Sequence, residues 1–223
     1  MHDNMERSPL AVLVIDVQRY YTESTSPLVT FTEARYTGST RYLLNRLDTA
    51  VIPNIETILK SARELDIPII YARLCGTAPD RSDLHQHFRD FDQMACLEAK
   101  THVYPLASEP LADIDQRIRP LPCDTVIDKT GYSAFHGTGL HEVLQSKGIS
   151  QLVLTGLTTS QCVNSTARAA ADYGYKTLMV EDAQADYDRR DHQAALYASE
   201  PITGRAVSTS DVLSLLSSNA NLP

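Results

Sequence analysis

Short apolar runs rich in β-branched residues alternate with stretches of helical periodicity along most of this 223-residue chain. The first run, residues 10–15 (LAVLVI), contains no polar residue, which is typical of a strand buried on both faces of a parallel sheet. In residues 51–65 the apolar side chains recur every three or four positions, which predicts an amphipathic helix, and Pro53 suits its first turn. This alternation predicts an α/β fold, a three-layer αβα sandwich with a mostly parallel, Rossmann-like sheet and helices on both faces.

The rest of the chain continues this pattern around two long polar segments. These segments, residues 17–45 and 77–104, lack a clear period and are interpreted as loops, and residues 24–46 as a candidate interface arm. No linker and no internal repeat divides the chain, so we expect a single domain over residues 1–223. Further strands are expected at 67–72, 125–127, 152–154, 177–180 and 206–207, and further helices at 140–144, 160–173, 191–198 and 211–216.

Composition excludes several classes of protein. The net charge is −8, and no basic stripe typical of a nucleic-acid-binding protein is visible. No apolar stretch approaches the roughly 20 residues that span a bilayer, and residues 1–9 lack the apolar core of a signal peptide. The four cysteines form no CxxC pair, which argues against a disulfide framework. We therefore expect a cytoplasmic protein that acts on a small molecule and binds neither nucleic acid nor membrane.

Residues whose side chains could take part in catalysis follow four of the predicted strands. Asp16 follows the first strand, Lys129 follows the strand at 125–127, and Asp182 follows the strand at 177–180. Cys162 comes after the strand at 152–154 and a short turn, where a helix is expected to begin. Because the carboxyl ends of parallel strands meet at one edge of a sheet, we expect these groups to lie close together.

Cys162 carries the strongest chemical argument. A helix N-terminus and a nearby cation such as Lys129 favour the reactive thiolate, and Asp16 could accept the thiol proton. The backbone N–H groups of the preceding turn could stabilise an oxyanion, so the site could attack a carbonyl, form a thioester and release an amine. Taken singly, Cys162 is better explained as a buried helix cysteine and Lys129 as a surface lysine, and Asp16 could be a solvated residue at a strand end. Only their joint placement favours catalysis. The other cysteines lack such a setting and are expected to be structural or incidental: Cys75, Cys96 and Cys123.

Three motifs carry a resemblance to a known family. They are LVIDVQ at 13–18, DKTGYSAF at 128–135 and TGLTTSQCVNSTA at 155–167. With them, the chain resembles the isochorismatase-like cysteine hydrolases, which include N-carbamoylsarcosine amidohydrolase, ureidoacrylate amidohydrolase, biuret hydrolase and nicotinamidase. The similarity extends from Leu10 to Leu216. It implies hydrolysis of a small amide-type substrate without a cofactor, and a homodimer or homotetramer.

The resemblance also implies roles for single residues. Asp16 resembles the family's proton acceptor, Lys129 the lysine paired with it, and Cys162 the nucleophile. The backbone N–H groups of Thr158 and Cys162 correspond to the oxyanion hole, with the family's cis peptide bond falling at Leu157–Thr158.

Departures from the subfamilies narrow the expected reaction. The metal-binding D-x-H pattern of nicotinamidases is missing after the second strand, and His85 and His87 lie in a polar loop without a third ligand in view, so we expect no metal. The intact set of Asp16, Lys129 and Cys162 favours C–N bond hydrolysis of an amide, ureido or N-carbamoyl substrate. Within the family, the stretch KTGYSAF at 129–135 looks most like the branch of N-carbamoylsarcosine, ureidoacrylate and biuret amidohydrolases. Two alternatives remain: a vinyl-ether hydrolase of the isochorismatase type, with Cys162 a bystander, and a non-catalytic protein that keeps the fold.

Five further residues are candidate substrate contacts. Aromatic side chains often form the walls of small-molecule sites, although these could as easily lie in the core. An arginine at a strand end could bind a substrate carboxylate, and a salt bridge to one of the acidic residues explains it equally well. The candidates are Gln18 of the D-x-Q motif, Tyr20, Arg73, Tyr132 and Phe135.

Overall fold

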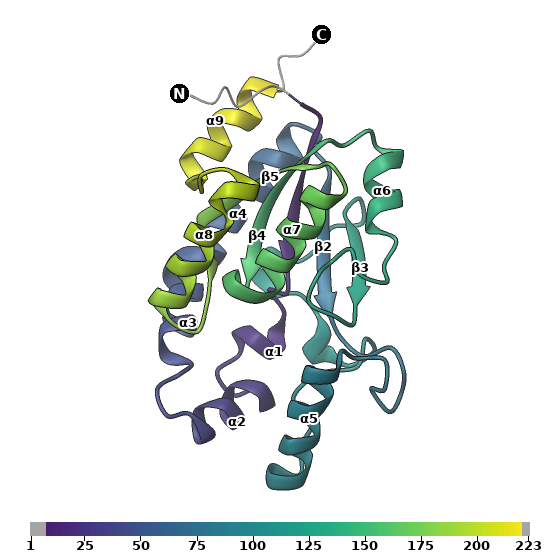
Figure 1. The fold of residues 1–223 in the computed structure, drawn as a ribbon, viewed down its shortest axis with the longest axis vertical. Coiled ribbons are helices and arrows are strands. Elements are labelled where there is room, and N and C mark those ends of the chain that lie inside the picture. The colour runs from purple at the N-terminus through teal and green to yellow at the C-terminus, as the bar shows by residue number, and fades with distance from the viewer. Residues whose placement is uncertain (1–7, 220–223) are drawn as a thin grey trace.

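A five-stranded parallel sheet forms the centre of the computed structural model, which describes residues 8–219 (Figure 1). The strand order is β3-β2-β1-β4-β5, so the direction of winding reverses between β1 and β4. Parallel α/β sheets of this kind bind ligands beyond the carboxyl ends of their strands at such a reversal. The strands are β1 (Leu10–Ile15), β2 (Ile69–Leu74), β3 (Thr125–Lys129), β4 (Gln151–Leu157) and β5 (Lys176–Ala185).

The apolar run of β1 lacks alternation because both faces of the sheet are covered. Every residue of β1 is buried. Val12 and Val14 pack into one hydrophobic cluster, whereas Leu13 and Ile15 pack into a second cluster on the opposite face. Two cores with the sheet between them are the physical basis of the three-layer sandwich, and they confirm the predicted fold class.

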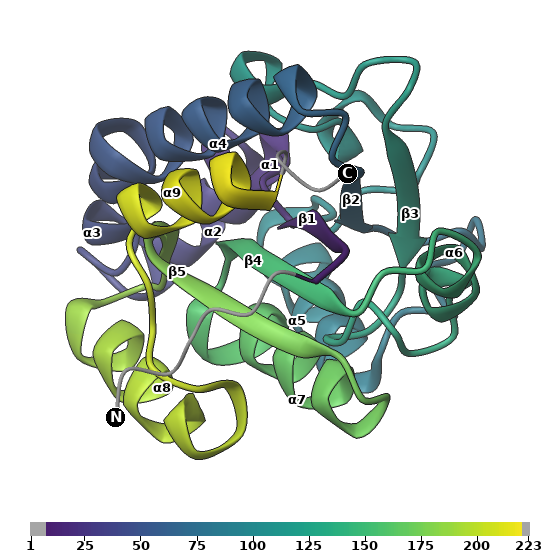
Figure 2. The same ribbon diagram turned by 90° about the horizontal axis from the view of Figure 1, so that it is seen from above.

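Helices cover both faces of the sheet, as the view from above shows (Figure 2). Helices α4 and α9 cover one face, and α6, α7 and α8 lie against the other. Among residues 8–219, no helix combines the length and apolar composition needed to cross a membrane. These helices are α4 (Ile52–Glu64), α6 (Leu140–Ser146), α7 (Asn164–Asp172), α8 (Arg189–Thr203) and α9 (Thr209–Asn219), with a π-helical turn η1 (Leu47–Val51) before α4.

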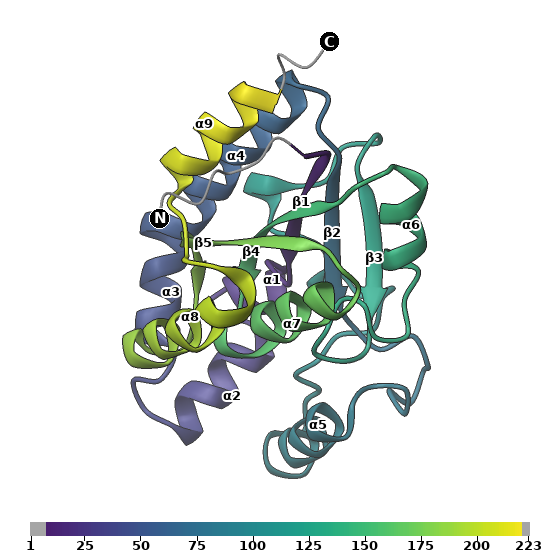
Figure 3. The same cartoon turned by 45° about the horizontal axis from the view of Figure 1, so that its top comes forward.

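The two long segments predicted as loops contain helices, so that prediction was wrong. Helices α2 and α5 lie beyond the carboxyl ends of the strands, outside the sandwich (Figure 3). Their buried residues, among them Leu28, Phe31 and Phe88, join the hydrophobic cluster on the α4 face of the sheet. The helices are α1 (Arg19–Thr22), α2 (Pro27–Arg35), α3 (Arg41–Arg46) and α5 (Gln86–Ala99), and single 3-10 turns lie at Pro110–Ala112 and Gln116–Ile118.

The end of the sheet also differs from the prediction. Strand β5 continues to Ala185, so Asp182 lies within it and not at its carboxyl end. The Asp182 carboxylate accepts hydrogen bonds from the backbone N–H and the hydroxyl of Thr209, and it thereby holds the start of α9. The strand predicted at 206–207 is a single bridge between Val180 and Val207.

Candidate active site

Asp16, Lys129 and Cys162 meet beyond the carboxyl ends of the strands. Asp16 follows β1, Lys129 is the last residue of β3, and Cys162 lies in a π-helical turn, η4 (Thr159–Val163), that leads into α7. Lys129 Nζ lies 2.9 Å from Asp16 Oδ2 and 3.4 Å from Cys162 Sγ. It also donates a hydrogen bond to the carbonyl of Gly131. The structure therefore brings together the three side chains that the strand ends predicted, and their catalytic roles remain predictions.

Backbone geometry at the end of β1 positions the Asp16 carboxylate. Asp16 has a φ of 55°, a left-handed conformation that is uncommon outside glycine and is found at functional sites. Beside it, Gly156 of β4 pairs with Ile15 and has a φ of 108°. A Cβ at Gly156 would lie 2.0 Å from the carbonyl oxygen of Ile15, so only glycine allows this approach. The sequence motif contains Gly156, but the close contact across the sheet is visible only in the structure.

Two buried side chains that the sequence analysis did not assign to the site hold the turn that carries Cys162. Asp186, which follows β5, accepts a hydrogen bond of 2.6 Å from the backbone N–H of Ser160. His192 of α8 lies 2.7 Å from the Thr159 hydroxyl through Nδ1 and 3.2 Å from Arg46 Nη2 through Nε2. Because arginine can only donate, Nε2 accepts and Nδ1–H donates to Thr159. Burial, followed by the charge of Arg46, lowers the pKa of His192 to about 4, so this imidazole is neutral at pH 7.

Burial also sets the protonation of the three central groups. It raises the pKa of the Cys162 thiol, and the Asp16 carboxylate raises it further, which together outweigh the opposite effect of Lys129. Burial lowers the pKa of Lys129, but the charges of Asp16 and Cys162 raise it above its ordinary value. The sequence predicted a lowered pKa for Cys162, whereas the structure favours a protonated thiol beside an Asp16–Lys129 ion pair.

The Asp16 carboxylate keeps one oxygen free for a proton. Among the described residues, no donor makes a hydrogen bond to Oδ1, although this oxygen is fully buried. Burial raises the pKa of Asp16, and Lys129 and Cys162 partly reverse this shift. An unpartnered carboxylate oxygen next to a thiol can accept the thiol proton.

Two of the predicted substrate contacts, Gln18 and Arg73, have other partners in the structure. The Gln18 amide donates hydrogen bonds to the carbonyls of Leu74 and Ala112 and accepts one from the Leu74 N–H, so it links strand ends. The Arg73 guanidinium binds the Asp128 carboxylate through two hydrogen bonds of 2.7 and 3.0 Å, which is the salt-bridge alternative. The polar groups of both side chains therefore form hydrogen bonds within the protein.

Phe135 packs in a hydrophobic core, and its contact with substrate remains a prediction. It belongs to the hydrophobic cluster that α6 and α7 cover, and its ring stacks on those of Tyr173 and Tyr175. The motif that contains Phe135 could not reveal which face of the sheet this ring joins.

An aromatic cavity of about 220 Å³ reaches the turn that carries Cys162. Gln161, which precedes Cys162 in the chain, contributes to its lining, whereas Asp16, Lys129 and Cys162 are not among the lining residues. The cavity is lined by Tyr21, Thr32, Tyr36, Ser39, His87, Phe88, Phe91, Tyr104, Gln161 and Tyr187.

Tyr20 and Tyr132 lie around this cavity without lining it. The Tyr20 ring is fully buried behind Tyr21 and Tyr104, and its hydroxyl has no hydrogen-bond partner among the described residues. Tyr132 packs against Phe88, with ring centroids 4.6 Å apart, and burial, followed by the charge of Cys162, raises the pKa of its hydroxyl. Both residues support the cavity from outside, and direct substrate contact remains a prediction.

His85 and His87 make different contacts in the structure. His85 precedes α5, and its Nδ1 accepts a hydrogen bond from the His87 N–H. His87 lines the aromatic cavity.

No cis peptide bond occurs in residues 8–219, so the Leu157–Thr158 bond is trans and the cis bond implied by the resemblance is not found. An oxyanion hole formed by the Thr158 and Cys162 N–H groups remains a prediction.

Comparisons with known proteins agree with this architecture. A family model described as the isochorismatase domain matches residues 10–211. Ureidoacrylate amidohydrolase RutB from Agrobacterium fabrum (strain C58 / ATCC 33970) is 26% identical over 97% of this chain and 93% of its own length. N-carbamoylsarcosine amidase from Arthrobacter sp is 29% identical over 74% of this chain and 61% of its own length.

Solved structures show the same fold. A cysteine hydrolase from Pseudomonas syringae pv. phaseolicola 1448A has a TM-score of 0.76 and 22% identity, covering 96% of this chain and 95% of its own. N-carbamoylsarcosine amidase from Thermoplasma acidophilum has a TM-score of 0.65 and 22% identity, covering 91% and 96%. Together with the family match over most of its length, these findings show that the chain belongs to the isochorismatase family.

Proposed function

We propose that this protein is a cysteine hydrolase that cleaves the C–N bond of a small amide, ureido or N-carbamoyl substrate. The observation that carries the proposal is the buried contact of Lys129 Nζ with both Asp16 Oδ2 and Cys162 Sγ. Relatives named as amidohydrolases, such as ureidoacrylate amidohydrolase RutB, support the same reaction class. The reaction would release ammonia and pass through a thioester.

In the first half of the proposed reaction, the Cys162 thiol is the nucleophile. Its proton passes to Asp16 while the sulfur attacks the substrate carbonyl, because a buried thiol ionises only when an acceptor is at hand. Lys129 keeps its positive charge and compensates the negative charge that moves from the carboxylate to the sulfur and then to the carbonyl oxygen. The Thr158 and Cys162 N–H groups are the proposed donors to that oxygen.

In the second half, the C–N bond breaks and the proton held by Asp16 passes to the leaving nitrogen, which departs as ammonia. The acyl group remains on Cys162 as a thioester. Asp16 then takes a proton from a water molecule that attacks the thioester, and returns it to the departing sulfur. Overall, one water is consumed, one acid and one ammonia are formed, and the site returns to its starting state.

The lining of the cavity favours a neutral substrate with an aromatic or apolar part. Within residues 8–219, the side chains that line the cavity include six tyrosine and phenylalanine rings and no lysine or arginine. Arg73, the cation that the sequence suggested for a carboxylate, is held by Asp128. A substrate carboxylate in this cavity would lack a paired cation and lose the free energy of its hydration.

Three other expectations remain predictions. A cytoplasmic location, the formation of a homodimer or homotetramer, and the absence of nucleic-acid and membrane partners rest on composition and on the family resemblance.

An ammonia-release screen tests the proposed function. We expect turnover of neutral aromatic amides such as nicotinamide to exceed that of ureido acids and N-carbamoyl amino acids, with biuret as a small neutral reference. Cys162→Ser should abolish ammonia release without loss of fold, whereas Cys123→Ser, which changes an exposed cysteine, should keep it. Full activity of Cys162→Ser would contradict the cysteine mechanism, and turnover of isochorismate by that variant would favour the vinyl-ether alternative.

A further inference from the structure

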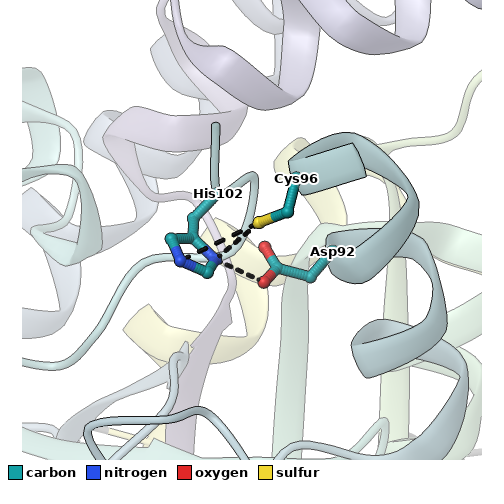
Figure 4. Close-up of side chains that lie close together, drawn as sticks. All are labelled: Asp92, Cys96 and His102. Carbon is teal, nitrogen blue, oxygen red and sulfur yellow. Dashed lines mark hydrogen bonds and ion pairs between the residues drawn. The ribbon is translucent and has the colours of Figure 1, made fainter. Parts of the chain in front are cut away.

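Three potential metal ligands converge at the end of α5, away from the Asp16–Lys129–Cys162 site. Asp92 and Cys96 are one helical turn apart on α5, and His102 follows in the next segment; Figure 4 shows the three side chains pointing toward one another. His102 Nδ1 lies 2.6 Å from Asp92 Oδ2 and 3.2 Å from Cys96 Sγ. Within residues 8–219, this is the one group of three or more such ligands whose atoms all lie within 4.8 Å.

The Asp92 carboxylate is already oriented by backbone donors. Its Oδ1 accepts hydrogen bonds from the N–H groups of Val103 and Tyr104, at 2.8 and 3.2 Å. The other oxygen, Oδ2, points to the His102 ring. Backbone hydrogen bonds of this kind commonly fix a carboxylate that binds a metal through its second oxygen.

The arrangement of His102 is that of a shared coordination centre and not of a proton relay. A relay would place the carboxylate and the thiol on the two different ring nitrogens, as in catalytic triads. Here the same nitrogen, Nδ1, is nearest to both Asp92 Oδ2 and Cys96 Sγ, while Nε2 lies farther from Sγ, at 3.8 Å. One N–H can be directed at only one of these atoms, whereas one cation can bind all three.

We infer that Asp92, Cys96 and His102 bind a divalent transition-metal ion of the zinc type. Thiolate sulfur, imidazole nitrogen and carboxylate oxygen are together the ligands that such ions prefer. Bonds of about 2.0–2.3 Å in a tetrahedron hold ligand atoms roughly 3.5 Å apart, so binding requires only small outward shifts of these side chains. The His102 side chain is 52% exposed, which leaves solvent access for a water as the fourth ligand.

The ion would act on the wall of the aromatic cavity. It would join α5, which carries Phe88 and Phe91, to the segment that carries Tyr104, and all three rings line the cavity. We expect the ion to hold this wall of the cavity in place. The sequence analysis expected no metal, because it considered only His85 and His87 as ligands, and it interpreted Cys96 as structural or incidental.

Cobalt binding to the full chain tests the inference. The Cys162→Ser protein, titrated with Co²⁺, should bind one ion per chain and show thiolate-to-cobalt charge-transfer absorption that Zn²⁺ removes. Cys96→Ser in the same background should lose this absorption, and His102→Asn should weaken binding by more than about tenfold. Cys123→Ser is the matched control, because Cys123 has an aspartate neighbour but no histidine contact, and it should keep the absorption.

Circular dichroism of each variant without metal keeps a loss of fold apart from a loss of the site. Should Cys96→Ser not fold, His102→Asn changes a half-exposed side chain and carries the test. The inference is overturned when the Cys162→Ser protein shows no thiolate–cobalt absorption, or when that absorption persists after Cys96→Ser.

Discussion

Replacing Asp16 with asparagine should make Cys162 more reactive toward alkylation and less able to hydrolyse substrate. Asn keeps the shape of the side chain but removes its negative charge. In the native site Asp16 raises the pKa of Cys162 and Lys129 lowers it. Without Asp16 the effect of Lys129 is left unopposed, so the pKa of the thiol falls, while the acceptor of its proton is lost.

The magnitude follows from the geometry. Both Asp16 Oδ2 and Cys162 Sγ contact Lys129 Nζ, at 2.9 and 3.4 Å, so they can be no more than roughly 6 Å apart. Two unit charges at roughly that distance interact by about 3 kcal/mol at an effective dielectric constant near 20. This corresponds to about a hundredfold more thiolate at neutral pH. Loss of the general base should reduce hydrolysis by about 10²–10⁴-fold.

Iodoacetamide labelling at pH 7, with the modified cysteine located by peptide mass mapping, measures the first effect, and ammonia release measures the second. Lys129→Met is the matched variant, because removing the positive charge should slow labelling of Cys162. An uncompensated buried lysine costs about 3–5 kcal/mol, so circular dichroism must show that Asp16→Asn is folded at the assay temperature. Labelling of Cys162 in Asp16→Asn that is no faster than in the native protein would refute the reasoning.

Two further predictions concern the supports of the site. Gly156→Ala should lower the free energy of unfolding by about 3 kcal/mol, because its Cβ would lie 2.0 Å from the Ile15 carbonyl oxygen. Gly139→Ala has open space around it and changes only the N-cap of α6, so it should cost no more than about 1 kcal/mol in the same urea titration; equal losses would contradict this. His192, with its pKa held near 4 against 6.5 when unfolded, should make the protein about 2 kcal/mol less stable at pH 5 than at pH 7, since only the unfolded chain binds the proton there. His192→Gln should remove this part of the pH dependence in urea unfolding, and an unchanged pH dependence would exclude the neutral imidazole.

The fold and the central triad were predictable because both depend on local patterns. An uninterrupted apolar run such as Leu10–Ile15 is compatible with burial on both faces, and the structure places it in the centre of the sheet. The carboxyl ends of parallel strands share an edge whatever the strand order, so Asp16, Lys129 and Cys162 could be expected together before that order was known. The helices in residues 17–45 and 77–104 were not predicted. They lie beyond the carboxyl ends of the strands, outside the helix layers that cover the sheet.

The pairing of side chains could not be predicted from the sequence, because it depends on distances between residues that are far apart in the chain. The sequence does not indicate which acidic residue forms a salt bridge with Arg73. In the structure this residue is Asp128, which lies opposite Arg73 in the register of β2 and β3. The same applies to the contact of Gly156 with Ile15 and to the turn after α5, where Lys100 adopts a φ of 55° in the segment that leads to His102.

By itself, the sequence determined the layers of this protein and the edge at which its reactive groups gather, because periodicity and strand ends are encoded within a few neighbouring residues. Only the tertiary structure decided the charge states and the contacts of those groups. Burial, which no short segment specifies, keeps the thiol of Cys162 protonated beside the ion pair, and long-range packing brings Asp92, Cys96 and His102 to one point.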